Sequence, residues 1–166
     1  EVFSSLGSGE WQTPGSGLKE VKACCDPRFV CLGIFDGDAC AGWGGARPLY
    51  RRYTWELHPL VISPTLQGCG LGSRLLDAIE QEVRRQGGAA ILLGADDENC
   101  RTNLHELDPS KLSLGQVISR IQNPGGHPYT FYQNRGYRII GIIPDTIRPG
   151  AYDILMWKSL QLSKKL

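Results

Sequence analysis

The spacing of apolar residues changes along residues 55–88, and this change predicts a strand, a turn and a helix. Residues 55–62 have the composition of a buried strand, in which successive side chains point to opposite faces. With this period of two, we expect Glu56, His58, Leu60 and Ile62 on one face and Trp55, Leu57 and Val61 on the other. A turn rich in glycine follows at residues 63–72. Beyond it, one apolar helical face is formed by Leu75, Leu76, Ile79 and Val83, and the helix ends at Gly87 and Gly88.

The other side of this helix is polar, and it includes Glu80 and Arg84, whose opposite charges attract at a spacing of four residues. Further elements are predicted on either side. Helices are expected at residues 18–25, 112–121 and 127–136, and strands at residues 29–35, 39–45, 89–95, 137–143 and 153–157. Asp36 and Gly37 predict a hairpin turn between the first two strands. Strands and helices in this order predict a mixed sheet of the α/β (α+β) class.

Two of the predicted strands have an unusual composition. Residues 89–95 are a continuous apolar run, which is typical of a strand buried on both faces. Gly42, Gly44 and Gly45 leave the second strand little side-chain bulk, which predicts either a bulge or close approach by another backbone or a ligand. Residues 48–53 after it are expected to form a loop or a strand edge.

Size and charge narrow the classes of protein. A chain of 166 residues is most simply one domain. Its 18 basic and 17 acidic residues give a net charge of +1 without a basic stripe, so we expect no nucleic-acid partner. Because the apolar runs are too short to cross a bilayer and no secretory signal is present, we expect no membrane partner and a cytoplasmic location. The 6 cysteines lack a C-x-x-C pair, so we expect reduced thiols and no metal site, although their even number leaves disulfides open.

The glycine-rich turn has the composition of a phosphate-binding loop. Amide groups at a helix start lack intrahelical partners, and the helix dipole favours an anion there. The G-x-G-x-x-G pattern fails because Ser73 stands where the third glycine belongs, and the Walker A pattern has no Gly-Lys-Ser/Thr. What remains is Gln67-x-x-Gly70-x-Gly72. This pattern alone is also compatible with an ordinary turn between a strand and a helix.

Two groups of polar residues are candidates for chemistry. Glu56 and His58 share a strand face, where they form either a proton-transfer pair or a hydrogen-bonded polar pair without catalytic function. Asp96, Asp97 and Glu98 follow a buried strand, and such a cluster either attracts a cationic substrate or forms a solvated loop.

Several strings in order resemble the aminoglycoside 6′-N-acetyltransferase branch of the GNAT superfamily. They are W-E-L-H-P-L-V at residues 55–61, Q-x-x-G-x-G at 67–72, L-G-A-D-D at 93–97, H-P-Y-x-F-Y at 127–132, P-D at 144–145 and D-I-x-M-x-K at 153–158. The resemblance extends over roughly residues 30–160 and implies a mostly antiparallel central sheet flanked by helices. It further implies acetyl transfer from acetyl-CoA to an amine of a small cationic aminosugar, and hence antibiotic resistance.

The resemblance also implies roles for individual residues. The pantetheine arm would pair with the backbone of Leu60, Val61 and Ile62, and Asn99 would bond to it. The pyrophosphate would lie on the loop formed by Gln67, Gly68, Cys69, Gly70, Leu71, Gly72 and Ser73. Glu56 and His58 would act in proton transfer or substrate binding, a division that the resemblance leaves open, and Tyr132 would lie near the sulfur of CoA and protonate the leaving thiolate. Substrate anions would be Glu56, Asp96, Asp97 and Asp153, with His58 beside them.

The chain departs from the branch at places that border the acceptor. The matched pattern begins inside the first helix of the family, so the first strand is expected to be missing. Leu107-Asp108-Pro109 replaces the usual Asp-Leu-Tyr string, and residues 147–152 lack the usual Gly-Lys-Pro ending. Two alternatives to an aminoglycoside acetyltransferase therefore remain: a GNAT enzyme for another polyamine or a protein amine, and a non-catalytic acetyl-CoA-binding domain. Relatives often dimerise, so a homodimer is a further expectation.

Overall fold

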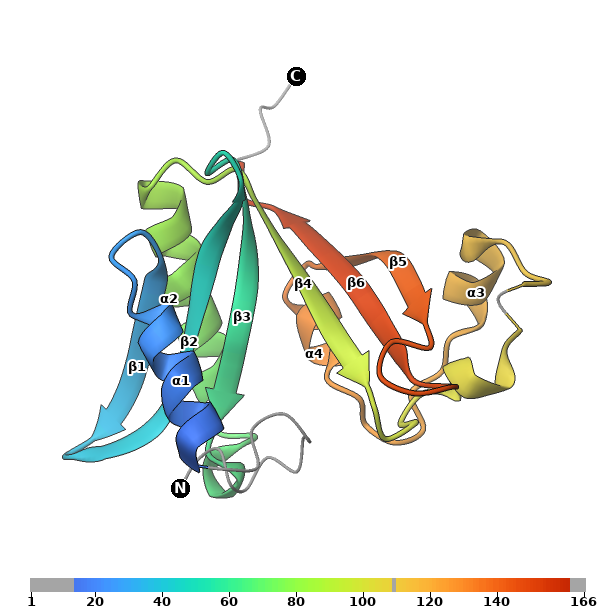
Figure 1. Cartoon of the computed structure of the whole chain (residues 1–166), viewed down its shortest axis with the longest axis horizontal. Helices are drawn as coiled ribbons and strands as arrows, with labels where there is room; N and C mark the ends of the chain where they lie inside the picture. Colours follow the sequence, from blue (N-terminus) through green and yellow to red (C-terminus); the bar gives the residue numbers. More distant parts are fainter. Residues whose placement is uncertain (1–13, 109, 162–166) are drawn as a thin grey trace. The chain divides into compact units, whose positions relative to one another are not determined.

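The computed structural model describes residues 14–108 and 110–161 (Figure 1). The six strands have the order β1-β2-β3-β4-β6-β5 in a mixed, mostly antiparallel sheet accompanied by helices, which confirms the predicted fold class. The chain divides into two compact units, Glu1–Ile91 with Ser159–Leu166, and Leu92–Lys158. In the part of the chain that is described, no helix combines the length and the apolar character that a membrane crossing requires.

The first unit holds a helix, a hairpin, a third strand and the predicted strand–turn–helix segment. Its elements are α1 Pro14–Cys24, β1 Val30–Asp36, β2 Ala39–Tyr50, β3 Thr54–Ile62, the short 3-10 helix η2 Pro64–Leu66 and α2 Leu71–Arg85. β1 and β2 pair in antiparallel fashion around the predicted turn, where Gly37 has a φ of +57°. β2 is longer than the sequence predicts and continues to Tyr50, through residues expected to form a loop or strand edge.

Buried side chains of the first unit lie against α2 and also against α1, where Cys24 packs with Trp43 and Val61. Burial alternates along β3, and Trp55, Leu57 and Val61 are buried. The prediction that these three share one face was wrong for Val61, which packs with Cys24 of α1, whereas Trp55 lies with Val83 of α2 beside Gly88. The register shift of β3 on β2 reverses the alternation between Leu57 and Leu60.

All four predicted apolar residues of α2 are at most 2% exposed. The prediction was wrong for Glu80, which is 2% exposed rather than on the solvent side. Its Oε2 lies 3.4 Å from Arg84 Nη2, as the spacing predicts, and Arg84 Nε also donates to the carbonyl of Leu160.

The glycines of β2 permit close contact between backbones. A Cβ on Gly44 would lie 2.8 Å from the carbonyl oxygen of Pro59, and one on Gly45 would lie 2.7 Å from that of Val30. The register of β2 on β3 also shifts between Gly44 and Ala46. Both features named as alternatives in the sequence, close backbone approach and a bulge, therefore occur here.

The second unit contains the remaining strands and three short helical segments. Its elements are β4 Ala90–Asp97, which begins in the first unit, the 3-10 helix η3 Asn103–Glu106, α3 Leu114–Arg120, α4 Tyr129–Asn134, β5 Arg138–Pro144 and β6 Tyr152–Ser159, which ends in the first unit. The prediction that residues 89–95 are buried on both faces was wrong at Gly94, which is exposed, whereas Leu93 and Ala95 are buried. α3 begins with a capping box between Ser113 and Gln116, and η3 was not predicted.

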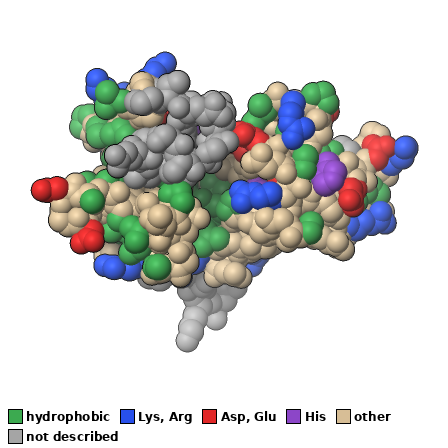
Figure 2. Space-filling view, turned by 90° about the horizontal axis from the view of Figure 1, so that it is seen from below, with side chains coloured by type: hydrophobic (Ala, Val, Ile, Leu, Met, Phe, Trp, Pro, Cys, Tyr) green, Lys and Arg blue, Asp and Glu red, His purple; other side chains and the backbone are tan. Residues whose placement is uncertain are grey.

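Side chains of both signs are scattered over the visible surface in Figure 2, in keeping with the net charge of +1. All 6 cysteines carry free thiols. Cys24 is buried and packs with Trp43 and Val61, whereas Cys25 and Cys69 are exposed. The cysteines are thus distributed between the core and the surface.

Candidate active site

The loop at the start of α2 has the geometry of an anion site. Gly68 and Gly70 have φ values of +77° and +81°, which favour glycine, and a Cβ on either residue would meet no atom within 4 Å. Gly70 is the N-cap of α2, and within residues 14–108 and 110–161 no side chain caps the helix. The first intrahelical bond runs from Arg74 N to Gly70 O. The amides of residues 71–73 therefore have no partner within the helix. An open loop with such amides can bind a phosphate group.

Side-chain and backbone contacts fix this loop to the strand before it. Gln67 Nε2 donates to the carbonyl of Ile62 at 3.2 Å, and Ser63 N donates to the carbonyl of Ala41 at 2.9 Å. The end of β3 thus leads directly into the loop. The backbone of Leu60, Val61 and Ile62 pairs along one edge with Gly44, Trp43 and Gly42 of β2.

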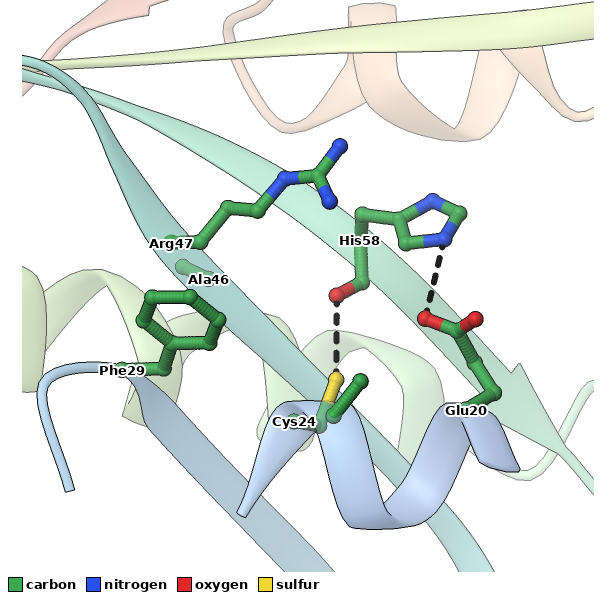
Figure 3. Close-up of a pocket in the computed structure, with 7 residues that line it drawn as sticks. Glu20, Cys24, Phe29, Ala46, Arg47 and His58 are labelled. Atoms are coloured by element: carbon green, nitrogen blue, oxygen red, sulfur yellow. Dashed lines mark hydrogen bonds and ion pairs between the residues drawn. The ribbon is translucent and has the colours of Figure 1, made fainter. Parts of the chain in front are cut away.

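Glu56 and His58 lie half-buried on the same face of β3, and each contacts an ionisable partner. Figure 3 shows the contact of His58 with Glu20. Arg47 is the register partner of Glu56 on β2, and its Nε lies 2.6 Å from Glu56 Oε2. The hydrogen bond to Glu56 raises the pKa of Arg47 above its ordinary value, so the guanidinium stays charged. On the other side, Glu20 of α1 places Oε1 3.2 Å from His58 Nε2.

A second contact joins α1 to β3 at His58. Cys24 donates from Sγ to the carbonyl of His58 over 3.4 Å. Burial, followed by the charges of Cys31 and Glu20, raises the pKa of the Cys24 thiol to about 12, so it remains a protonated donor. Glu20, Arg47 and His58 line a small pocket together with Cys24 and Phe29. The prediction from sequence included Glu56 and His58 but missed Glu20 and Arg47.

In the second unit, Tyr132 lies half-buried on α4 among other aromatic rings. Its ring meets Phe131 and Tyr137 edge-on, with centroids 5.1 and 5.7 Å apart. Burial raises the pKa of Tyr132 above its ordinary value. The hydroxyl therefore carries its proton at neutral pH, as a general acid requires.

The start of α4 is held by His127, which is 1% exposed. Its Nε2 donates to the carbonyl of Asp96 at 3.0 Å, and its Nδ1 accepts from the backbone N–H of Tyr129 at 3.2 Å. This pattern requires the neutral ring with hydrogen on Nε2. Burial lowers the pKa of His127 despite the carbonyl of Asp96 and the charge of Asp97, which raise it. The sequence showed His127 only as part of a matched string.

The predicted acidic residues differ in their surroundings. Asp97 is 2% exposed, and its carboxylate accepts from Arg101 N at 2.6 Å, Thr102 N at 3.0 Å and Thr102 Oγ1 at 2.6 Å. Burial alone would raise the pKa of Asp97, but the hydrogen bonds from Thr102 and Arg101 outweigh it and lower the pKa. This geometry favours a structural role for Asp97, and its contact with a substrate stays a prediction.

The exposed face of β4 presents a different arrangement. Gly94 and Asp96 are exposed there, and a Cβ on Gly94 would lie 2.6 Å from Oδ2 of Asp153 on β6. Asp153 therefore lies directly over the backbone of Gly94. Asn99, predicted to bond pantetheine, is exposed in the turn after β4.

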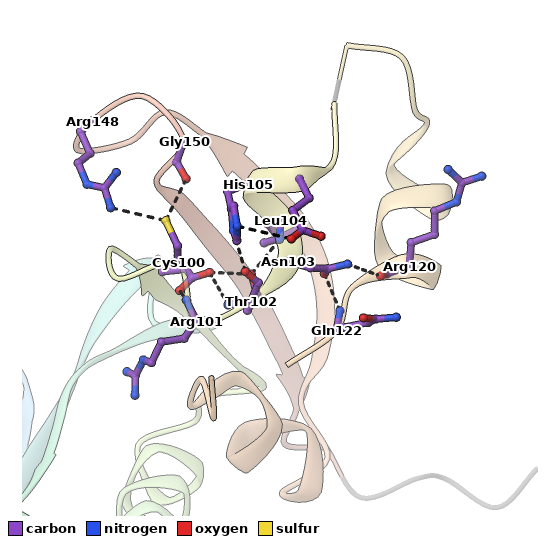
Figure 4. A network of polar contacts seen from close by, with 12 residues as sticks. Cys100, Arg101, Thr102, Asn103, Leu104, His105, Arg120, Gln122, Arg148 and Gly150 are labelled. Carbon is purple, nitrogen blue, oxygen red and sulfur yellow. Dashed lines mark hydrogen bonds and ion pairs between the residues drawn. The ribbon is translucent and has the colours of Figure 1, made fainter. Parts of the chain in front are cut away.

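The long connection after β4 is held by polar contacts (Figure 4). Asn103 donates from Nδ2 to the carbonyl of Arg120 at 3.1 Å and accepts from Gln122 N at 2.7 Å. Just before the connection begins, the carbonyl of Glu98 accepts a hydrogen bond from Arg148 Nη2 at 2.5 Å. These contacts join residue 103 to residues 120 and 122 of the same connection, and residue 98 to residue 148.

Comparisons with known proteins agree with this geometry. Residues 3–106 match the model of the Acetyltransferase (GNAT) family. An aminoglycoside 6′-N-acetyltransferase solved with coenzyme A is 34% identical, with a TM-score of 0.85 over 90% of this chain and 82% of that one. The aminoglycoside 6′-N-acetyltransferase from Enterococcus faecium is 32% identical, with a TM-score of 0.88 over 97% of this chain and 88% of that one. No curated protein sequence matches the chain.

Proposed function

The chain belongs to the GNAT family of acetyltransferases, whose cosubstrate is acetyl-CoA, and we propose that it acetylates the 6′-amino group of aminoglycosides. The choice of substrate is supported by similarity to two enzymes of this activity, which extends over 90% and 97% of the chain. In a cell this reaction would confer resistance to these antibiotics. We further propose that residues 1–166 form one acetyltransferase domain, and dimerisation stays a prediction.

The proposed cosubstrate site begins at the open loop before α2. The amides of residues 67–73 would hold the pyrophosphate, and the left-handed glycines at 68 and 70 support this assignment. Pantetheine would bind to backbone groups of Leu60, Val61 and Ile62, and Asn99 would bond to it. A backbone N–H of this strand would also stabilise the oxyanion that forms when the thioester carbonyl is attacked.

In the proposed reaction the amine nitrogen bonds to the acetyl carbon and the bond from that carbon to sulfur breaks. His58 would accept the proton that the ammonium group must lose, and Tyr132 would protonate the thiolate of CoA. Arg47 occupies Glu56 Oε2 at 2.6 Å, which supports assigning Glu56 to holding the cationic substrate rather than to proton transfer. Asp96 and Asp153 would supply further negative charge for a polycation.

The test is release of CoA thiol from acetyl-CoA by the purified protein, with mass spectrometry of the product. We expect turnover with an aminoglycoside that carries a 6′-amine and none with its 6′-hydroxyl analogue. Spermidine and a peptide amine are the comparison acceptors. Turnover only with these would move the substrate to the second candidate class, another polyamine or a protein amine. Binding of acetyl-CoA without turnover of any amine would contradict the proposal and favour a non-catalytic domain.

A further inference from the structure

Helix α1 contacts His58 at two points from consecutive turns (Figure 3). Glu20 and Cys24 are four residues apart, so their side chains leave the same side of the helix. Cys24 Sγ donates to the backbone carbonyl of His58 at 3.4 Å, and Glu20 Oε1 lies 3.2 Å from His58 Nε2. One contact fixes the main chain of this residue and the other fixes its ring.

The contact with Glu20 determines which ring nitrogen carries hydrogen. An ionised carboxylate only accepts hydrogen bonds, so a neutral imidazole that bonds to it must have its hydrogen on Nε2. The lone pair is then on Nδ1. In Figure 3 the ring nitrogen that is not bonded to Glu20 points away from α1. A proton from outside this helix would therefore be accepted at Nδ1.

We propose that Glu20 is a positioning residue, which holds the ring of His58 as the Nε2–H tautomer so that Nδ1 accepts the proton of the acceptor amine. This inference rests on the proposed function. The proton leaves the ammonium nitrogen and bonds to Nδ1, and the imidazolium that forms is stabilised by the charge of Glu20 until it releases the proton to water. Glu20 touches neither substrate nor cosubstrate in this assignment and acts through His58.

The surroundings of the Glu20–His58 contact distinguish it from an ordinary surface ion pair. The side chains of His58 and Glu20 are 38% and 25% exposed, and an exposed pair alone adds little stability. Here the backbone of His58 is fixed by Cys24, and the neighbouring acid Glu56 is bonded to Arg47. Orientation of the ring, rather than stability, is what the contact supplies.

The tautomer is measurable without any turnover. Long-range nitrogen–proton spectra of the full chain, labelled with nitrogen-15 and recorded where the imidazoles are neutral, report which nitrogen carries hydrogen in each histidine. His127 and His105 are internal references, because Nε2 of His127 faces the carbonyl of Asp96 and Nδ1 of His105 faces that of Thr102. We expect wild-type His58 to resemble His127. In Glu20→Gln, whose amide also donates, we expect the Nδ1–H form to appear.

The kinetic part uses the same variants. Glu20→Gln should lower kcat about tenfold to a hundredfold, the range found when a partner that orients a metal-ligating histidine is removed, and should leave KM for acetyl-CoA unchanged. Glu20→Asp keeps the carboxylate and should restore part of kcat together with the Nε2–H form. Asp38→Asn is the charge-matched control, since Asp38 is exposed in the turn between β1 and β2, and it should behave as wild type.

The outcomes separate this inference from the proposed function. An Nδ1–H form in wild-type His58, or an unchanged tautomer in both Glu20→Gln and Glu20→Asp, overturns the inference even if aminoglycosides are acetylated. A changed tautomer with the kcat of Asp38→Asn also overturns it. If the wild type acetylates no amine, the proposed function fails, and loss of the Nε2–H form in Glu20→Gln still supports the positioning of His58.

Discussion

Arg47 and Glu56 face each other across β2 and β3 as register partners, with Nε and Oε2 2.6 Å apart. Their side chains are 49% and 27% exposed, so the pair contributes at most about 1 kcal/mol to the free energy of unfolding. What it fixes is the direction of a carboxylate next to His58. The function of this pair is therefore separable from its effect on stability.

We expect Arg47→Met to lower kcat/KM for the aminoglycoside several-fold while the free energy of unfolding changes by about 1 kcal/mol or less. Steady-state kinetics and urea unfolding measure the two quantities. Arg85→Gln is the matched control, because it breaks an ion pair with Glu82 on the surface of α2. Equal loss of activity in both variants would show that Arg47 does not orient Glu56 for the substrate.

Gly70→Ala tests the loop before α2. Gly70 has a φ of +81° and open space around it, so alanine would be strained by its backbone conformation alone, at a cost of about 1 kcal/mol. We expect the loop to shift and the Kd for CoA, measured by calorimetry, to rise about tenfold. Gly37→Ala carries the same kind of strain in the hairpin turn and should leave the Kd unchanged. A wild-type Kd in Gly70→Ala would remove this loop from the cosubstrate site.

Gly94→Ala tests the acidic face of β4. Its Cβ would lie 2.6 Å from Oδ2 of Asp153, so the carboxylate must move. If Asp153 binds the cationic substrate, KM for the aminoglycoside should rise several-fold while KM for acetyl-CoA stays constant. Gly115→Ala is the control in α3, where a Cβ meets nothing within 4 Å and alanine should stabilise the helix by about 0.5–1 kcal/mol. An unchanged KM would argue that Asp153 has no contact with the substrate.

Local periodicity in the sequence was enough to predict that β3 and α2 exist and which apolar side chains of α2 are buried, but not the reversal of faces in β3 after its register shift. Each depends on side chains within a few residues of one another, such as Trp55 with Leu57 or Leu76 with Ile79. The matched strings then identified Glu56, His58 and Tyr132 as candidates. Periodicity and short sequence strings can both be recognised within a single segment of the chain.

The partners of these residues could not be predicted in the same way. Arg47 meets Glu56 only through the register of two strands with a shift between Gly44 and Ala46, and the sequence pattern placed the end of that strand before Arg47. Glu20 meets His58 only because α1 packs there through Cys24. The sequence left Asp97 either as a substrate anion or as part of a solvated loop, and neither alternative predicts the hydrogen bonds that its carboxylate accepts from Arg101 and Thr102 in the loop after it. Tertiary contacts, not local pattern, decide all three.

Tyr132→Phe tests the proposed general acid. Burial raises the pKa of Tyr132, so the hydroxyl keeps its proton at neutral and moderately alkaline pH. The substitution is therefore needed to remove the proton donor. We expect kcat to fall about a hundredfold, which is typical of a lost proton transfer, with the Kd for CoA unchanged. Phe131→Leu, on the same helix, should have a much smaller effect on kcat. Equal kcat in wild type and Tyr132→Phe would assign this ring to packing.

The buried ring of His127 should make the stability of the protein depend on pH. Its pKa in the folded state lies below that of an unfolded histidine, about 6.5. Above this value both states are neutral and the stabilisation is fully present. As the pH falls below it the unfolded chain binds the proton first, so the free energy of unfolding decreases until the folded ring is also protonated. Asp97 nearby would reduce and Arg101 would increase this shift.

We therefore expect the free energy of unfolding, from urea titrations, to fall between about pH 7.5 and about pH 5.5, and to fall less in His127→Gln. Asp97 does not account for this range, since its lowered pKa makes its contribution disappear only below the value of an unfolded aspartate, about 3.9. Because His127 bonds to the backbone of Tyr129 and so holds the start of α4, which carries Tyr132, the variant should also lose kcat. An equal pH slope in wild type and variant would show that His127 is protonated as readily in the folded protein as in the unfolded chain.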